Sequence, residues 1–156
     1  MKKDFFDYII QLMFQNKDIY FISCGLGWPR TDELKKFKDR FVQAEASEQT
    51  ALDISVGLAY EGKMPFVYTI TTFFLRGYET IRTYIDHEHL NVKLIGAGRD
   101  DDYSKHDGFS HECGDIPDLL SFFDIKQYFP ETNEEMKQNL DEMITNKNPE
   151  FLSIKK

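Results

Sequence analysis

The chain is organised around residues 39–62, which read DRFVQAEASEQTALDISVGLAYEG. The stretch opens with a short apolar run at Phe41 and Val42, continues through a polar turn and then shows helical spacing of its apolar residues. Gly62 stands where a helix stop is expected. The pattern therefore predicts a strand, a tight turn and a helix. In an open α/β sheet such a turn lies at the carboxyl edge of the strands, where ligands bind.

Within this stretch, Ser47 is a good N-cap residue for the predicted helix, which places Glu48 in the first helical turn. Leu52, Val56 and Ala59 form the predicted apolar face of the helix. Two roles are open for Glu48. It can complement the helix dipole, a contribution of about 0.3–1 kcal/mol, or it can be a functional carboxyl at the ligand-binding edge.

Strand and helix patterns alternate along the rest of the chain. The further strand patterns lie at residues 19–23, 65–69 with an extension to 72, 92–95, 125–129 and 150–154. The further helical patterns lie at residues 4–14, 32–37, 73–86, 116–123 and 133–145. This alternation predicts an α/β fold, with a mostly parallel sheet of about six strands, right-handed crossovers and helices on both faces. The longest irregular stretch is a polar loop at residues 99–114.

Size and composition narrow the class of protein. The 156 residues suffice for one domain with a proper core, and no repeat or linker marks a boundary, so we expect one domain over residues 1–156. The net charge of −8, without a basic tract, argues against nucleic acid as a partner. No apolar run is long enough to span a membrane. Cys24 and Cys113 show no metal or redox spacing, so we expect reduced thiols in a cytoplasmic protein.

Two glycine pairs follow strand patterns, Gly25-x-Gly27 and Gly96-x-Gly98. Neither pair has the third glycine of a dinucleotide fingerprint or a Walker-type lysine after it, so both are expected to be plain turns. The sequence therefore shows no phosphate cradle. If the chain handles a phosphorylated cofactor, we expect a partner to hold the phosphates.

Three sequence pieces stand at predicted strand ends: ASEQ at residues 46–49, TTFFLR at residues 71–76 and DGFSH at residues 107–111. In this order and spacing they resemble the pyrimidine-binding domain of transketolase-type thiamine diphosphate enzymes, and most closely transketolases and deoxyxylulose phosphate synthases. The likeness covers residues 19–154, nearly the whole chain. It implies the thiamine diphosphate-binding fold, with thiamine diphosphate as the cofactor.

The resemblance also implies which residues bind the cofactor. Glu48 falls on the glutamate that contacts the aminopyrimidine ring nitrogen and stabilises the imino tautomer, whose nitrogen removes a proton from the thiazolium carbon. Gln49 follows it in the motif, and Phe73 falls on the aromatic residue that stacks on the pyrimidine. Apart from the resemblance, Phe73 is equally well a core residue at the start of a helix.

The resemblance assigns substrate contacts to Arg76, Asp107 and His111, and a catalytic contact to the histidine. Arg76 stands where deoxyxylulose phosphate synthases carry an arginine and transketolases a phenylalanine, and a guanidinium suits a phosphate or a carboxylate. Asp107 and His111 belong to the family's Asp-Gly-x-Thr-His loop, whose histidine contacts the substrate. Without the resemblance, Arg76 would be a solvated helix residue and His111 an exposed loop residue.

The polar loop permits a rival interpretation as a hard-metal or zinc site. Its candidate ligands are Asp100, Asp101, Asp102, His106, Asp107, His111, Cys113 and Asp115. Three consecutive acids cannot all face one ion, and the spacing matches no standard site. We therefore expect a solvated acidic loop without a metal. In the resembling family, Mg²⁺ belongs with the diphosphate on another domain.

Members of that family normally carry a diphosphate-binding domain before this one and a third domain after it. We therefore expect the pyrimidine-binding subunit of a split transketolase-like enzyme, active only with a diphosphate-binding partner chain that holds Mg²⁺. Two copies of each chain are expected, with thiamine diphosphate bridging them. The enzyme would transfer a two-carbon ketol or acyl unit, with a sugar phosphate or 2-oxo acid as substrate.

Other functions stay open at this stage. One is a subunit of a decarboxylating 2-oxo acid synthase, and another is a catalytically silent structural or regulatory subunit of the same fold. The joint presence of Glu48, Phe73 and His111 argues against the silent subunit, because a fold alone does not need them. A third alternative, a stand-alone metal-binding α/β protein, rests only on the acidic loop.

Overall fold

The computed structural model describes residues 1–25 and 31–156, and its central feature is a six-stranded sheet. All neighbouring strands pair in parallel, in the order β2-β1-β3-β4-β6-β5. The strands are β1 (Ile19–Ser23), β2 (Phe41–Gln43), β3 (Met64–Ile70), β4 (Lys93–Ala97), β5 (Lys126–Tyr128) and β6 (Glu150–Ile154). The predicted α/β fold with a parallel six-stranded sheet is confirmed. Gly27 of the first glycine pair lies outside the described residues.

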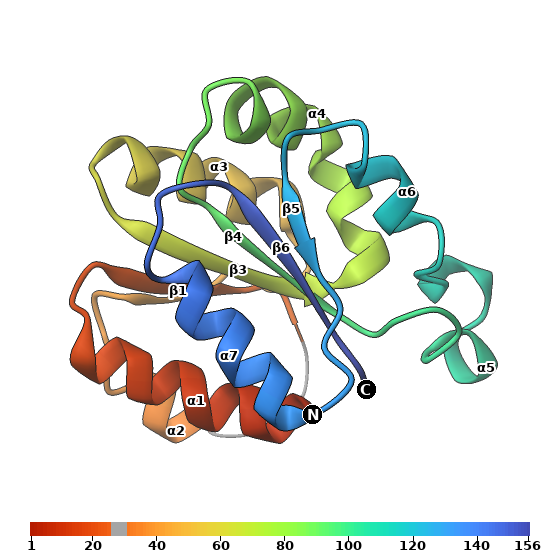
Figure 1. Ribbon diagram of the computed structural model, residues 1–156, viewed down its shortest axis with the longest axis horizontal. Coiled ribbons are helices and arrows are strands. Elements are labelled where there is room, and N and C mark those ends of the chain that lie inside the picture. Colours follow the sequence, from red (N-terminus) through yellow and green to blue (C-terminus); the bar gives the residue numbers. More distant parts are fainter. Residues whose placement is uncertain (26–30) are drawn as a thin grey trace.

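Helices cover both faces of this sheet (Figure 1), as predicted. One face carries α1 (Lys2–Gln15), α2 (Thr31–Leu34) and α7 (Asn133–Met143). The other face carries α3 (Glu48–Tyr60), the consecutive helical turns η1 (Thr71–Gly77), α4 (Tyr78–Thr80) and η2 (Ile81–Asp86), and α6 (Ile116–Leu120). The polar loop after β4 contains α5 (Ser104–Asp107) and η3 (Phe109–His111). In the described part of the chain, no helix combines the length and apolar character needed to cross a membrane.

Strand β3 lies in the middle of the sheet and contributes side chains to the core on each face. Phe66 and Tyr68 pack with α1 and α7, whereas Val67 between them packs on the side of α3. This alternation follows from the two-residue period of a strand. Phe5 of α1 stacks on Tyr68, with ring centroids 5.8 Å apart. The carboxyl end of β3 is therefore held between two packed layers.

Helix α3 packs on the sheet through a stripe that differs from the predicted one. Its buried residues are Glu48, Ala51, Leu52 and Ser55. Of the predicted apolar face only Leu52 is buried, while Val56 and Ala59 are partly exposed. These four residues are spaced i, i+3, i+4 and i+7, so they share one face of the helix. The face that packs on the sheet therefore includes a charged side chain, Glu48, at the first residue of the helix.

Several helix ends also differ from the sequence prediction. The Ser47 hydroxyl precedes α3 but donates to Thr50 Oγ1 at 2.7 Å instead of accepting a backbone N–H, so Ser47 is not the expected side-chain cap. Helix α2 ends at Leu34 rather than at residue 37. Helical turn η1 begins at Thr71, where the strand was expected to continue. Gly62 follows α3 with a φ of 75°, which confirms the predicted helix stop.

Candidate functional site

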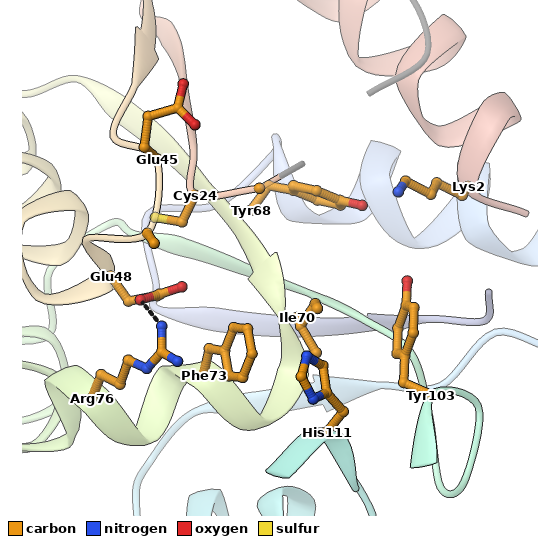
Figure 2. A pocket seen from close by; sticks show the side chains of 12 residues that line it. Lys2, Cys24, Glu45, Glu48, Tyr68, Ile70, Phe73, Arg76, Tyr103 and His111 are labelled. Atoms are coloured by element: carbon orange, nitrogen blue, oxygen red, sulfur yellow. Dashed lines mark hydrogen bonds and ion pairs between the residues drawn. The ribbon is translucent and has the colours of Figure 1, made fainter. Parts of the chain in front are cut away.

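A cavity of about 370 Å³ opens at the carboxyl edge of β1 and β3 (Figure 2). Four side chains predicted for the site line it, namely Glu48, Phe73, Arg76 and His111. They belong to α3, η1 and η3, which are far apart in the sequence. The carboxyl ends of parallel strands meet at one edge of a sheet, and this topology brings the three motifs together.

Glu48 is almost completely buried, with 2% of its surface exposed. Its Oε2 accepts a hydrogen bond from Arg76 Nη1 at 2.7 Å, and its Oε1 accepts one from Thr69 Oγ1 at 3.2 Å. Thr69 stands near the end of β3, and the Arg76 side chain on η1 is 50% exposed. Two elements thus hold a buried carboxylate at the cavity wall, and the guanidinium offsets the cost of burying its charge.

Phe73 connects Arg76 to His111. The guanidinium carbon of Arg76 lies 4.0 Å from the centroid of the Phe73 ring, which is a cation–π contact. The His111 ring meets the same phenyl at an angle of 65°, with centroids 5.0 Å apart. His111 Nδ1 also lies 2.9 Å from the Ser110 hydroxyl. The partly buried Phe73 ring therefore gives the cavity a flat aromatic wall between a cation and an imidazole.

Two predicted site residues lie outside this cavity. Gln49 is exposed and lines a neighbouring polar cavity of about 340 Å³, which Arg76 also borders together with Asp53 and Glu79. Asp107 is the last residue of α5 and is exposed. Their assigned roles in cofactor and substrate binding stay predictions.

Other residues of the site were not predicted from the sequence. Lys2, Cys24, Tyr68 and Tyr103 line the cavity, and Thr69 supports its carboxylate. Cys24 and Thr69 stand at strand carboxyl ends, so the strand patterns in the sequence already indicate that both lie at this edge of the sheet. Lys2 and Tyr103 carry no local signal, because α1 and the loop after β4 reach the cavity only through tertiary packing.

The charges of the cavity act on its thiol. The pKa of Cys24 is raised to about 12, chiefly by burial and secondly by the negative charge of Glu48, while Arg76 opposes the rise. Burial lowers the pKa of Lys2, and the nearby ammonium of Lys156 lowers it further. Figure 2 shows Lys2 and Glu48 on opposite sides of the cavity, so the ammonium of Lys2 lies apart from the Glu48–Arg76 ion pair.

The acidic loop was the basis of the rival metal-site interpretation. In the described part of the chain, no group of three or more His, Cys, Asp and Glu side chains is arranged to hold a metal ion. Asp101 pairs with Lys105 at 3.2 Å, and Asp102 Oδ2 accepts from the backbone N–H groups of Arg99 and Lys156, each at 3.0 Å. The acidic side chains of Asp101 and Asp102 thus stabilise the conformation of the loop.

The second glycine pair serves packing rather than a phosphate cradle. Gly96 lies inside β4 instead of in the predicted turn, and a Cβ atom there would come 2.4 Å from Thr71 Oγ1 and 2.9 Å from the Phe151 ring. Gly98 has a φ of 88°, and its Cβ would lie 2.3 Å from the Tyr103 ring. The absence of side chains at these positions lets η1 and the following loop close over β4.

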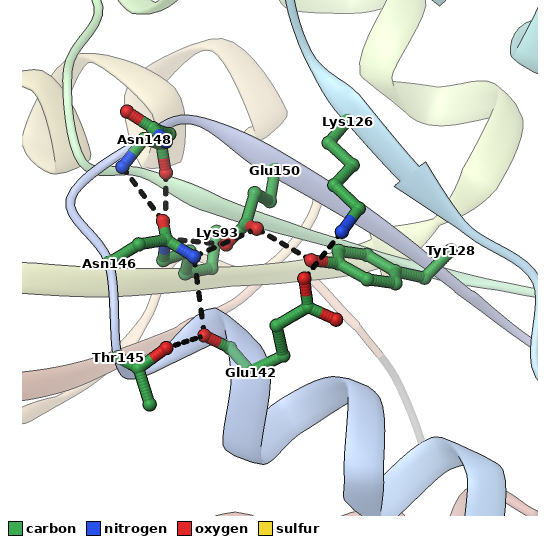
Figure 3. Close-up of polar contacts among 8 residues, drawn as sticks. All are labelled: Lys93, Lys126, Tyr128, Glu142, Thr145, Asn146, Asn148 and Glu150. Atoms are coloured by element: carbon green, nitrogen blue, oxygen red, sulfur yellow. Dashed lines mark hydrogen bonds and ion pairs between the residues drawn. The ribbon is translucent and has the colours of Figure 1, made fainter.

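A second buried ion pair lies at the opposite, amino edge of the sheet (Figure 3). Lys93 Nζ lies 2.7 Å from Glu150 Oε2 and also donates to the backbone carbonyl of Asn148 and to Asn146 Oδ1. The Tyr128 hydroxyl donates to Glu150 Oε1 at 2.7 Å. Burial lowers the pKa of Lys93, and Glu150 opposes this shift. The network joins β4, β5 and β6, and Glu150, Asn146 and Asn148 also border a polar cavity of about 280 Å³.

The chain is similar in sequence to proteins of one family. A family model described as "Transketolase, pyrimidine binding domain" matches residues 8–156. An apulose-4-phosphate transketolase subunit from Phocaeicola vulgatus is 31% identical over 124 residues, which cover 78% of this chain and 40% of that protein. The putative transketolase C-terminal section of Methanocaldococcus jannaschii is 28% identical over 120 residues, which cover 74% of this chain and 38% of that protein. This chain thus spans about two fifths of the length of these curated relatives.

Solved structures share the architecture. A split gene transketolase, described as an inactive beta4 tetramer, superposes with a TM-score of 0.83 at 20% identity, over 97% of this chain and 50% of that one. The transketolase from Campylobacter jejuni superposes with a TM-score of 0.81 at 12% identity, over 98% of this chain and 25% of that one. At these identities the likeness shows the fold, which is that of a transketolase domain. The family resemblance predicted from the three motifs is confirmed.

The titration of Cys24 tests the arrangement of charges in the cavity. In a Cys113→Ser background, Glu48→Gln should lower the pKa of Cys24, because it removes a negative charge next to the thiol. Arg76→Met should raise this pKa, because it removes a positive charge. From about pH 8 to pH 11, below this pKa, the rate of alkylation by iodoacetamide is proportional to the thiolate fraction, so a lower pKa gives faster alkylation at each pH and a higher pKa slower alkylation. Glu61→Gln removes an exposed acid at the far end of the same helix as a control, and a profile identical in all variants would contradict the geometry.

The Lys93 network makes a prediction about stability. Lys93→Met should lower the free energy of unfolding by about 3–5 kcal/mol, because it leaves the Glu150 charge buried without its partner. Lys126→Met is the matched control, since the Lys126–Glu142 ion pair is exposed and screened by solvent, so its loss should lower the free energy of unfolding much less. Urea unfolding followed by circular dichroism measures both losses. Equal losses in the two variants would show that the Lys93 pair is not buried as described.

Proposed function

We infer that the cavity binds the pyrimidine half of thiamine diphosphate, from one premise: the chain belongs to the transketolase pyrimidine-binding domain family. Membership of this family implies dependence on thiamine diphosphate. The observation that carries the inference is the buried carboxylate of Glu48, which faces the cavity beside the Phe73 ring. Burying a carboxylate lowers the stability of the fold, and a role in cofactor binding explains why Glu48 is nevertheless buried beside the cavity.

The cavity suits a planar heteroaromatic ring. Its walls are largely apolar, and Phe73 offers a flat aromatic surface on which such a ring can pack. Glu48 offers a carboxylate that can hold a proton at a ring nitrogen. Thr69 fixes one oxygen of this carboxylate through its hydroxyl group. These residues fit the aminopyrimidine half of the cofactor.

When bound, thiamine diphosphate supplies a thiazolium carbon that can carry a two-carbon ketol or acyl unit between substrates. In the proposed complex, Glu48 shares a proton with the pyrimidine nitrogen and Phe73 orients the ring. His111, which meets the far side of Phe73 from the loop after β4, contacts the substrate and completes the catalytic set.

The remaining predicted residues keep their roles within the proposal. Gln49 supports cofactor binding from the residue next to Glu48. Asp107 contributes to substrate binding through the loop that carries His111. The half-exposed Arg76 side chain is the cation available for a phosphate or carboxylate group of the substrate.

The proposal includes a partner chain that holds the diphosphate and its Mg²⁺, because no glycine-rich cradle for phosphate appears in the described residues. The curated relatives are named as a transketolase subunit and as a "C-terminal section", and these names support a division of the enzyme between chains. We propose two copies of each chain in the cytoplasm, with residues 1–156 as one pyrimidine-binding domain. The complete enzyme would transfer a two-carbon unit, with a sugar phosphate or 2-oxo acid as substrate.

Glu48→Gln tests the proposed proton sharing. Glutamine keeps the size of the side chain and a hydrogen bond, but it cannot hold the shared proton. In the complex with a diphosphate-binding chain, exchange of the thiazolium proton for deuterium should slow by about 10²–10⁴-fold, the usual contribution of a positioned acid–base group. Quench-flow NMR of the cofactor measures this exchange without a known substrate.

Glu61→Gln is the matched control for this experiment. Glu61 is exposed at the far end of α3, so its variant should exchange the thiazolium proton at the wild-type rate. If Glu48→Gln exchanges the proton as fast as this control does, Glu48 has no catalytic role.

Exposed apolar side chains beside the cavity predict where the partner binds. Phe109 of η3 is 86% exposed and stands two residues before His111, and Leu75 of η1 is 43% exposed. Co-expression with a diphosphate-binding chain from the neighbouring gene should give a complex, measured by size-exclusion chromatography with light scattering. Phe109→Asp should weaken this association about tenfold or more, as for an aromatic anchor of an interface. Tyr60→Asp, at the opposite end of α3, should leave it unchanged, and a chain that stays monomeric beside its partner would contradict the proposal.

A further inference from the structure

The Arg76 guanidinium occupies the space between Glu48 and Phe73 (Figure 2). It donates to Glu48 Oε2 at 2.7 Å, and its carbon lies 4.0 Å from the centroid of the Phe73 ring. A guanidinium is a planar cation with N–H donors around its edge. Arg76 therefore already makes the two contacts that the proposed function gives to the aminopyrimidine ring, one to the carboxylate and one to the phenyl face.

The guanidinium and a pyrimidine ring cannot both occupy this space. At 4.0 Å the guanidinium is in van der Waals contact with the phenyl face, so no second planar group fits between them. The His111 ring contacts the same phenyl at a centroid distance of 5.0 Å. A ring that packs on the face now covered by the guanidinium and reaches Glu48 Oε2 must therefore displace the guanidinium.

We propose that Arg76 is a displaceable placeholder, which pairs with Glu48 in the empty cavity and leaves when the pyrimidine ring enters. The inference rests on the proposed function, because it takes Glu48 and Phe73 to be the residues that bind this ring. Arg76 acts here as a positioning residue. It keeps the carboxylate buried and oriented before the ring arrives, since a buried charge without a partner is strongly unfavourable.

Arg76 also borders the polar cavity of about 340 Å³, which includes the exposed carboxylates of Asp53 and Glu79. Its half-exposed side chain thus lies between the two cavities, and the inference takes the polar cavity as the second position of the guanidinium. An ion pair on the exposed side is screened by solvent and is weaker than the pair with the buried Glu48. The inner position is therefore favoured until a ring takes its place.

The placeholder lowers the affinity of the cavity for the ring. If the binding-competent state is populated to about one tenth, the apparent affinity falls about tenfold. Removing the guanidinium should then raise the affinity, whereas removing a direct ligand would lower it. The sign of the change therefore separates a placeholder from a ligand.

The test measures binding of thiamine, which carries the pyrimidine ring without the diphosphate, to the intact chain by isothermal titration calorimetry. Arg76→Met should bind thiamine about tenfold more tightly than the wild type. Arg82→Met removes an exposed arginine from the same helical segment and should leave the affinity unchanged. If Arg76→Met does not fold, Arg76→Lys replaces it, because lysine keeps a cation for Glu48 without a planar group, and it too should bind more tightly.

A second readout follows the displacement itself. The side-chain ¹⁵N–¹H signal of Arg76, assigned by its loss in Arg76→Lys, should shift when thiamine is added, while the signal of Arg82 stays in place. The double variant Asp53→Asn, Glu79→Gln removes the outer position and should weaken thiamine binding.

The outcomes separate this inference from the proposed function. Unchanged or weaker thiamine binding by the Arg76 variants would overturn the placeholder and leave the proposed cofactor site standing. Absence of thiamine binding by the wild type and by both Arg76 variants would overturn the cofactor site and the placeholder together. Tighter binding by the Arg76 variants, with a shifted Arg76 signal in the wild type, is the result that supports the placeholder.

Discussion

The geometry of the site depends on the burial of one carboxylate, that of Glu48 at the start of α3. A buried carboxylate needs donors, and it finds them in Thr69 of β3 and Arg76 of η1. One side chain therefore ties together three elements at the carboxyl edge of the sheet. Ala51, Leu52 and Ser55 share the buried face of α3 with Glu48, so the packing of this face on the sheet also buries the carboxylate. The cavity is the space that these contacts leave open beside Phe73.

The sequence predicts the sheet well because its central strands are buried on both faces and read as continuous apolar runs. The patterns at residues 19–23 and 150–154 coincide with β1 and β6. The sequence predicts the buried stripe of α3 less well, because the apolar character of Val56 and Ala59 does not show which face of the helix the sheet covers. The start of η1 at Thr71 depends on a tertiary contact, the hydrogen bond from its hydroxyl to the carbonyl of Gly98 at 2.6 Å.

The candidate site could be predicted to the extent that its residues follow strand ends. Glu48, Phe73 and His111 meet for this reason, since parallel strands bring their carboxyl ends to one edge. The pairing of Arg76 with Glu48 could not be predicted, because 28 residues separate them and the contact depends on how η1 crosses α3. Lys2 reaches the cavity from α1 on the opposite face of the sheet, and no local sequence pattern indicates that it lies near the cavity.

Gly96 limits how this site can change during evolution. The missing side chain lets Thr71 and Phe151 close over β4, and Thr71 begins the segment that carries Phe73 and Arg76. A larger residue at position 96 would shift that whole segment. A substitution in the strand beneath the cavity would therefore also change the wall of the cavity. The loop at residues 99–114 shares this constraint, because His111 contacts Phe73 and Tyr103 packs against Gly98. Divergence of the loop is therefore coupled to the same cavity wall at these two positions.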